Sequence, residues 1–183
     1  MRNQKQNKLA AMMATAFVAV AEALAQDQQV TASEDGEESR RRIVVSIADR
    51  KLAVVEDGRV LKIYPTAVGA DATPSPTGVF KIANRVVNPT WYGPNHQIVP
   101  PGKANPLGTR WIGLSRRGYG IHGTNRPGSI GRPASHGCIR MRKADVEELF
   151  ELIKVGDGVE FFSEPSDKSA WIFNPGEAIV SAE

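Results

Sequence analysis

The sequence predicts a mainly β domain, of sandwich or barrel-like form, with one principal helix near its C-terminal end. Two observations support this fold class. Short segments of alternating apolar residues recur along the chain, as is typical of a β sandwich or barrel. A single segment carries the apolar stripe of an amphipathic helix.

The predicted strands begin at Ile43, where apolar and other residues start to alternate. Asp57-Gly58 then predicts a tight hairpin turn into the next strand. Further strands are predicted at 79–82, 111–114, 119–121 and 159–162. The helix is predicted at 145–154 and ends before Gly156. Its apolar stripe consists of Val146, Leu149, Phe150 and Ile153.

The first 25 residues have the pattern of an export signal peptide. A basic start precedes an uncharged apolar run at 9–20 and a small-x-small cleavage site at 23–25. This run is shorter than the roughly 20 residues that a membrane-spanning helix needs. We therefore expect cleavage after Ala25, and an uncleaved signal is the one predicted route to a membrane.

The remaining chain divides into a linker, one domain and a tail. Residues 26–41 are polar and acidic and are expected to be a disordered linker. Residues 42–163 form the predicted domain. The tail at 164–183 has no assigned role, although Trp171, Ile172 and Phe173 give it apolar side chains for docking. A long loop region at 88–105 either walls a cleft or covers an edge of the core.

Charge gives no support for nucleic-acid binding. The chain has 23 basic and 20 acidic residues. The expected signal peptide holds Arg2, Lys5 and Lys8 against the single acidic Glu22, so the mature chain is nearly neutral. The basic clusters lack the interleaved aromatic residues of a nucleic-acid surface.

Residues 121–141 hold the only cysteine, Cys138, and two of the three histidines, His122 and His136. A thiol close to an imidazole suits a cysteine nucleophile with a nearby base. The alternative is a small buried thiol beside two loop histidines. Cysteines of exported proteins are usually paired in disulfides, but Cys138 has no partner in its own chain. It is an intermolecular link, an inert thiol or a reactive one, and an unpaired thiol in an oxidising compartment favours a chemical role.

An ordered series of motifs resembles the L,D-transpeptidase catalytic domain, or YkuD domain, of bacterial cell-wall enzymes. The resemblance extends from about Ile43 to Phe162. The motifs are Thr-Gly-Val-Phe at 77–80, Asn-Pro-Thr-Trp at 88–91, Pro-Pro-Gly at 100–102, Asn-Pro-Leu-Gly at 105–108, Ile-His-Gly-Thr at 121–124 and Ser-His-Gly-Cys-Ile-Arg-Met at 135–141. The resemblance implies a YkuD-type β fold and a catalytic domain at 42–163.

The resemblance also implies roles for individual residues. Cys138 is expected to be the nucleophile, and His122 the base that lowers the effective pKa of the thiol. The backbone carbonyl of Gly123 would complete the triad. The backbone N–H groups of the turn at 135–138 would stabilise the oxyanion. The remaining oxyanion or substrate candidates are Ser135, His136, Gly137, Arg140 and Trp91.

Two of these candidates have structural alternatives. His136 contacts substrate or adjusts Cys138, or else it holds the loop in shape. Arg140 pairs with a substrate carboxylate, or else it forms a structural salt bridge.

The implied reaction has two steps and needs no metal or organic cofactor. Cys138 attacks the carbonyl before the terminal D-Ala of a peptidoglycan stem peptide, and an amine then takes the acyl group from the thioester. An amine of another stem gives a 3→3 crosslink, a wall-attached protein gives a protein–wall bond, and water makes the enzyme an L,D-carboxypeptidase. Because this substrate lies at the wall, we expect the protein in the periplasm or cell wall.

Other classes fit the residues less well. A sortase would show a Thr-x-Thr-Cys strand, and a papain-like or NlpC-type peptidase places its cysteine before its histidine. A zinc site built from His122, His136 and Cys138 lacks recognisable ligand spacing. A non-catalytic wall-binding module is the main non-enzymatic alternative, and it would not need both His122 and Cys138.

Overall fold

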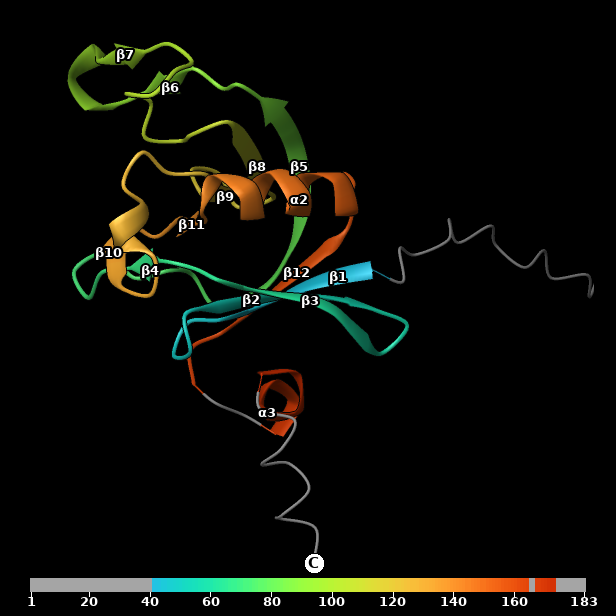
Figure 1. Cartoon of the computed structure of the whole chain (residues 1–183). Helices are drawn as coiled ribbons and strands as arrows, with labels where there is room; N and C mark the ends of the chain where they lie inside the picture. Colours follow the sequence, from blue (N-terminus) through green and yellow to red (C-terminus); the bar gives the residue numbers. More distant parts are fainter. Residues whose placement is uncertain (1–40, 165–166, 174–183) are drawn as a thin grey trace, which may run out of the picture. The chain divides into compact units, whose positions relative to one another are not determined.

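A curled eight-stranded sheet forms the centre of the protein (Figure 1). The computed structural model describes residues 41–164 and 167–173. The strands of this sheet are β1 (Arg41–Ser46), β2 (Lys51–Glu56), β3 (Arg59–Pro65), β5 (Gly78–Val87), β8 (Arg110–Leu114), β9 (Gly120–His122), β11 (Ile139–Arg140) and β12 (Gly158–Phe162). Their order is β11-β9-β8-β5-β12-β1-β2-β3. Only β1 with β12 and β9 with β11 pair in parallel within this sheet.

Two short sheets and four helical segments complete the described part of the chain. β4 (Val68–Gly69) pairs with β10 (Pro133–Ser135), and β6 (Trp91–Tyr92) pairs with β7 (Ile98–Val99). The helical segments are α2 (Lys143–Leu152), α3 (Asp167–Phe173) and the 3-10 turns η1 (Pro94–His96) and η2 (Pro127–Ser129). Within the described ranges, none of the helices is long and apolar enough to cross a membrane.

The mainly β fold with one principal helix is confirmed. The Asp57-Gly58 turn is also confirmed, since both residues have positive φ, 50° and 74°, as a tight hairpin of this kind requires. The helix starts and ends two residues earlier than predicted. It ends there because Ile153 is extended, with φ −117° and ψ 160°.

The expected signal peptide lies outside the described residues, as do residues 26–40 of the expected linker. Arg41, the last residue of that expected linker, is instead the first residue of β1. It pairs there with Glu56, its Nη2 atom lying 2.6 Å from the carboxylate oxygen.

The central strands are buried on both faces. Ile43 and Val45 of β1 join the large core cluster that α2 covers, whereas Val44 between them joins a second cluster on the other face. β2 repeats this division, because Leu52 and Val54 enter the first cluster while its intervening residues enter the second. A strand buried on both sides needs a continuous apolar run rather than strict alternation.

Helix α3 covers the second face of these strands. Ile172 and Phe173 are 1% and 5% exposed. They pack in the cluster with Val44, Ala53 and Val55. The expectation that the apolar tail residues dock is therefore confirmed for this stretch, and the surface that receives them is the β1–β2 face.

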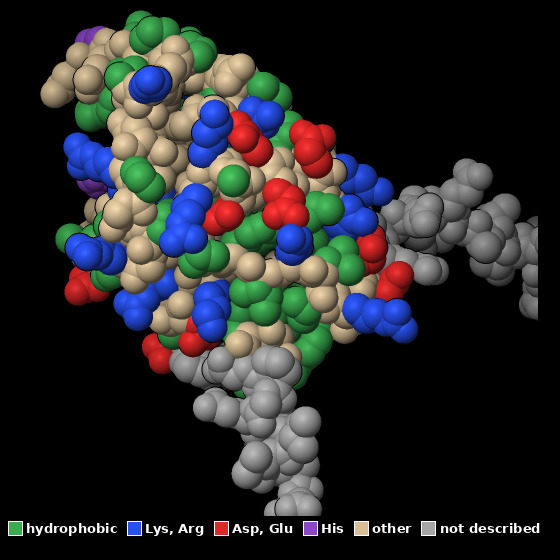
Figure 2. Space-filling model, in the orientation of Figure 1, with side chains coloured by type: hydrophobic (Ala, Val, Ile, Leu, Met, Phe, Trp, Pro, Cys, Tyr) green, Lys and Arg blue, Asp and Glu red, His purple; other side chains and the backbone are tan. Residues whose placement is uncertain are grey.

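Charged side chains of both signs are interspersed on the face that carries α2 (Figure 2). Lys62 of β3 lies 2.8 Å from the Glu148 carboxylate of this helix. Glu147 faces Arg110 of β8 at 3.8 Å and accepts a hydrogen bond from Thr109. These contacts attach α2 to the edge strand β3 and to β8, which is the third strand from the opposite edge.

We predict that Ile172→Ala destabilises the protein by about 2 kcal/mol or more, because it leaves a cavity beneath α3. Urea unfolding followed by tryptophan fluorescence measures this loss. Val155→Ala is the matched control, since Val155 is 56% exposed and its truncation should change stability by less than about 0.5 kcal/mol. Equal effects of the two substitutions would show that α3 is not docked in solution.

Candidate active site

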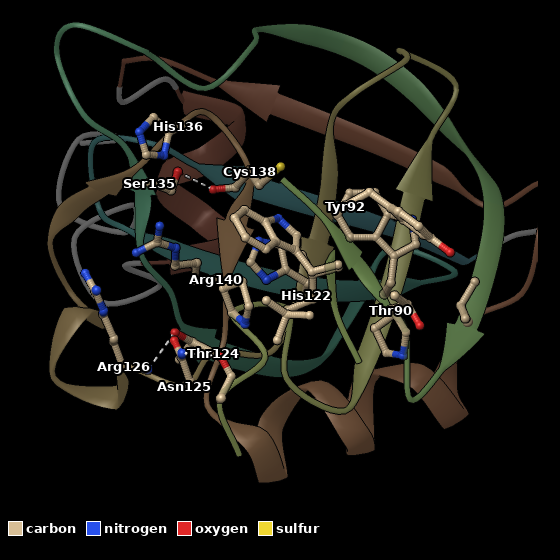
Figure 3. A pocket seen from close by; sticks show the side chains of 18 of the residues that line it. Thr90, Tyr92, His122, Thr124, Asn125, Arg126, Ser135, His136, Cys138 and Arg140 are labelled. Atoms are coloured by element: carbon tan, nitrogen blue, oxygen red, sulfur yellow. Dashed lines mark hydrogen bonds between the residues drawn. The ribbon is translucent and has the colours of Figure 1, made fainter. Parts of the chain in front are cut away.

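The pairing of β9 with β11 brings the thiol and the imidazole to one face of the sheet. Ile121 lies opposite Ile139, and His122 lies opposite Arg140. The two isoleucines are fully buried in the core. Because side chains alternate between faces, His122 and Arg140 point away from the core, and Cys138 follows the same alternation. Both His122 and Cys138 line a cleft of about 1060 Å³ (Figure 3).

The region at 88–105 forms one wall of this cleft. Trp91 and Tyr92, from β6, both line it, so of the two interpretations offered for the aromatic residues here, the structure supports the cleft wall. Trp91 was a substrate candidate, and the structure places its half-buried side chain in the lining.

The cleft wall is held by one buried side chain. Asn105 is fully buried. Its amide donates to the carbonyls of Pro89, Val99 and Pro100 at 2.8, 3.0 and 3.2 Å, and its Oδ1 accepts from the N–H of Leu107 at 2.9 Å. Backbone groups outside the eight-stranded sheet are thereby satisfied, as burial requires. The wall is consequently an ordered structure although it contains little secondary structure.

His122 is oriented by the residue that follows it. Its Nδ1 lies 2.6 Å from the carbonyl oxygen of Gly123. A carbonyl can only accept, so Nδ1 carries the proton and Nε2 is left as the acceptor. The His122 ring also stacks on Trp111 of β8, with centroids 5.8 Å apart and an interplanar angle of 27°. The structure thus brings His122 and Gly123 together as the resemblance implied.

Burial keeps His122 neutral. Burial and, to a smaller extent, the positive charge of Arg140 together lower the pKa of His122 to about 4, despite the opposing hydrogen bond to Gly123. An imidazole with this pKa is uncharged near pH 7. It can accept a proton but does not hold one at rest.

Burial also raises the pKa of the Cys138 thiol, and this outweighs the lowering by the Gly120 backbone and by Arg140. The thiol faces the carbonyl oxygen of Gly118 at 3.7 Å. This result differs from the expectation that His122 lowers the pKa of the thiol. The thiol and the imidazole, which line the same cleft, are therefore both uncharged near pH 7.

Ser135 braces the turn that carries Cys138. Its hydroxyl donates to the Cys138 carbonyl at 2.5 Å (dashed in Figure 3) and accepts from the Gly137 N–H at 3.0 Å. Gly137 has φ 103°, and a Cβ there would lie 2.7 Å from the Tyr119 ring. The Ser135 hydroxyl and the Gly137 N–H are therefore occupied within the turn. His136 is exposed at the rim of the cleft.

Trp111 is a site residue that sequence reasoning missed. Its indole N–H donates to Asn84 at 3.1 Å. A Cβ at Gly113 or Gly120 would lie within 3 Å of its side chain. The glycines at 113 and 120, inside two predicted strands, were the available signal, because an interior glycine often marks a close approach.

The zinc alternative finds no support in the geometry. Over residues 41–164 and 167–173, no three side chains of the metal-binding types His, Cys, Asp and Glu are grouped to hold an ion. His136 contributes only to the rim of the cleft that His122 and Cys138 share.

The site thus combines a thiol, Cys138, with an imidazole, His122, that a backbone carbonyl orients. Both groups line one cleft of a mainly β domain. The family model of the YkuD L,D-transpeptidase catalytic domain matches residues 40–161. The chain belongs to this family.

Curated relatives agree with this assignment. The chain is 44% identical over 117 residues to YkuD of Bacillus subtilis (strain 168), with 64% of this chain and 63% of that protein covered. It is 32% identical over 138 residues to YbiS of Escherichia coli (strain K12), with 67% and 45% covered. Both relatives bear the name L,D-transpeptidase. The match thus spans less than two thirds of the length of each.

Solved structures share the fold. An L,D-transpeptidase of Enterococcus faecium matches with a TM-score of 0.58 and 26% identity, covering 67% of this chain and 50% of that one. An L,D-transpeptidase from Mycobacterium smegmatis matches with the same TM-score at 20% identity, covering 68% and 59%. This second likeness concerns the fold alone.

We predict that alkylation of Cys138 by iodoacetamide accelerates with pH, with its inflection above the ordinary thiol pKa. Only the thiolate reacts, and burial raises the pKa of this group. Mass spectrometry of the single cysteine follows the reaction, and the urea-unfolded protein is the control with an ordinary inflection. An inflection below pH 7 would instead indicate a preformed thiolate–imidazolium pair.

We predict that Gly120→Ala displaces Trp111 from His122, because the new Cβ would lie 2.6 Å from the indole ring. The change in pKa of His122, measured by NMR titration, reports the displacement, and we expect the pKa to rise as the ring becomes solvated. Gly128→Ala is the control, since a Cβ there meets nothing within 4 Å. An unchanged His122 pKa in Gly120→Ala would argue against the positioning role of Trp111.

Proposed function

We propose that this protein is a peptidoglycan L,D-transpeptidase that acts through a Cys138 acyl-enzyme. The observation that carries the proposal is the 2.6 Å contact between His122 Nδ1 and the Gly123 carbonyl. It fixes the tautomer in which Nε2 is a base, on the strand face that also carries Cys138. Membership of the L,D-transpeptidase family supplies the substrate class.

In the first step, Cys138 attacks the carbonyl carbon before the terminal D-Ala of a stem tetrapeptide. The sulfur forms a C–S bond while its proton moves to His122 Nε2. The C–N bond then breaks, and the same proton passes to the leaving amine of D-Ala. Because both groups are neutral at rest, the proton moves during the attack and not before it.

The carbonyl oxygen becomes negative during this attack and needs hydrogen-bond donors. The Gly137 N–H already donates to Ser135, so we assign the donor role to the Cys138 N–H in the same turn. The aromatic wall formed by Trp91 and Tyr92 would hold the stem peptide across the cleft. Ser135 and Gly137 then act by shaping the turn.

In the second step, an amine attacks the thioester carbonyl and the C–S bond breaks, while His122 takes the proton of the amine and passes it to the departing sulfur, which restores the thiol. An amine on another stem gives a 3→3 crosslink, and an amine on a wall-attached protein gives a protein–wall bond. Water as the acceptor gives L,D-carboxypeptidase activity. A protein with this substrate acts outside the cytoplasm, in the periplasm or cell wall, which agrees with the export signal expected at residues 1–25.

We predict that the protein incubated with a stem tetrapeptide gains the mass of the tetrapeptide minus D-Ala. Intact-protein mass spectrometry detects this adduct, and added amine acceptors distinguish transfer from hydrolysis. Cys138→Ala should form no adduct. His122→Asn should form it at least about 100-fold more slowly, as expected for loss of a general base.

His96→Asn is the matched control for the histidine substitution. His96 is exposed in η1 and lies outside the lining of the main cleft, so this variant should acylate at the wild-type rate. Folded, reduced protein that neither gains the adduct nor releases D-Ala would overturn the proposal. That outcome would favour the wall-binding module.

A further inference from the structure

The cleft that holds Cys138 is lined by charged residues of one sign only. Among the described residues that line it, Arg126 and Arg140 are basic, and there is no aspartate or glutamate. The α2 face differs, because acidic and basic side chains are interspersed there (Figure 2). In Figure 3 the two arginines lie with Thr124 on the side of the cleft opposite Tyr92. The cleft therefore has a cationic side and an aromatic side.

Neither guanidinium has an acidic partner in the part of the chain that the structure describes. The ion pairs there are formed by other cations, such as Arg110 with Glu147 and Lys62 with Glu148. The structural alternative for Arg140, a salt bridge, is thus absent from the described residues. Two arginines in a cleft whose described lining holds no carboxylate indicate that a bound ligand supplies one.

Hydrogen bonds anchor the backbone that carries both arginines. Arg140 is bound on both sides of its backbone, because its N–H donates to Ala67 and its carbonyl accepts from Ala67, each at 2.9 Å. The N–H of Arg126 donates to the Thr124 hydroxyl at 3.0 Å. The side-chain amide of Asn125, which precedes Arg126 in the chain, donates to the Ala104 carbonyl at 3.0 Å. The backbone from which the two arginines extend is therefore anchored on this side of the cleft.

The two positive charges oppose each other. Arg140 is half-buried, and after burial itself, the charge of Arg126 is the strongest influence that lowers the pKa of Arg140. An anion bound between them would relieve this repulsion. Guanidinium groups bind carboxylates through paired, charge-assisted hydrogen bonds, so a carboxylate suits this side of the cleft.

We propose that Arg126 and Arg140 form a carboxylate-binding subsite that selects stem peptides by a free carboxylate close to the bond that is cleaved. This inference rests on the proposed function and deepens it. Cys138 and Arg140 are two residues apart on one face, which corresponds to roughly 7 Å along a strand. A carboxylate at Arg140 thus lies within about one or two residues of a carbonyl at the sulfur.

Two carboxylates of a stem peptide satisfy this distance. One is the terminal carboxylate of the departing D-Ala, and the other is a side-chain carboxylate of the residue that is acylated. The two sources share the same chemistry, and amidation of one at a time distinguishes them.

The experiment compares acylation of Cys138 by three tetrapeptides: the free acid, the peptide with a terminal D-alaninamide, and the peptide amidated only on its side-chain carboxylate. We expect one of the two amidations to slow wild-type acylation about tenfold or more, as for loss of a charge-assisted pair. The sensitive position identifies the source. In the Arg126→Gln and Arg140→Gln variants, the free-acid peptide should acylate Cys138 slowly. These variants should also lose most of the wild-type preference for the free-acid peptide over the amidated one.

Arg117→Gln is the matched control, because it removes one exposed positive charge outside the cleft lining and should keep the full preference. Arg126 is itself exposed, so its substitution tests the subsite even where Arg140→Gln fails to fold. Equal acylation of all three peptides by the wild type, or variants that slow acid and amide alike, would overturn the subsite while the proposed function stands. Absence of any acyl-enzyme would overturn the proposed function itself.

Discussion

The parallel pairing of β9 with β11 is the constraint on which the site depends. It sets Arg140 beside His122 and leaves Cys138 one residue before the strand. The same register buries Ile121 and Ile139 on the opposite face. A slip of β11 by one residue would turn Cys138 and Arg140 into the core and Ile139 into the cleft. Burial of two apolar side chains thereby fixes the relative placement of the reactive groups.

Burial also decides the charge state of this site. Desolvation raises the pKa of the Cys138 thiol and lowers the pKa of the His122 imidazole, and in both cases it favours the uncharged form. The nearby arginine adds to this for the imidazole, since a second positive charge there would be repelled. The chemistry proposed for the site is therefore proton transfer coupled to attack, within a cleft whose fixed charge is positive.

The sequence identifies the groups that the chemistry uses but not those that hold them. His122, Gly123 and Cys138 stand in contiguous motifs, so their neighbours in the chain indicate them. Trp111 acts through contacts with Asn84 and His122, which lie on other strands, and no local pattern distinguishes it from an ordinary strand residue. Asn105 stands in the Asn-Pro-Leu-Gly motif, but the motif does not indicate which backbone groups its side chain binds. Arg126 is similar, because its significance lies in its proximity to Arg140 and in the absence of acidic residues from the described cleft lining.

The sequence contains a signal for the docking of α3, but an interpretation based on alternating apolar residues does not show it. The runs around Val44 and Ala53 are apolar at consecutive positions, which indicates strands buried on both faces. A second covering layer was thus required, and the tail holds apolar side chains that supply it.

The neutral resting state of Cys138 has its own consequence for durability. Peroxides and disulfides react with thiolates far faster than with thiols, so a cysteine that ionises only when substrate is attacked is protected from oxidation while it waits.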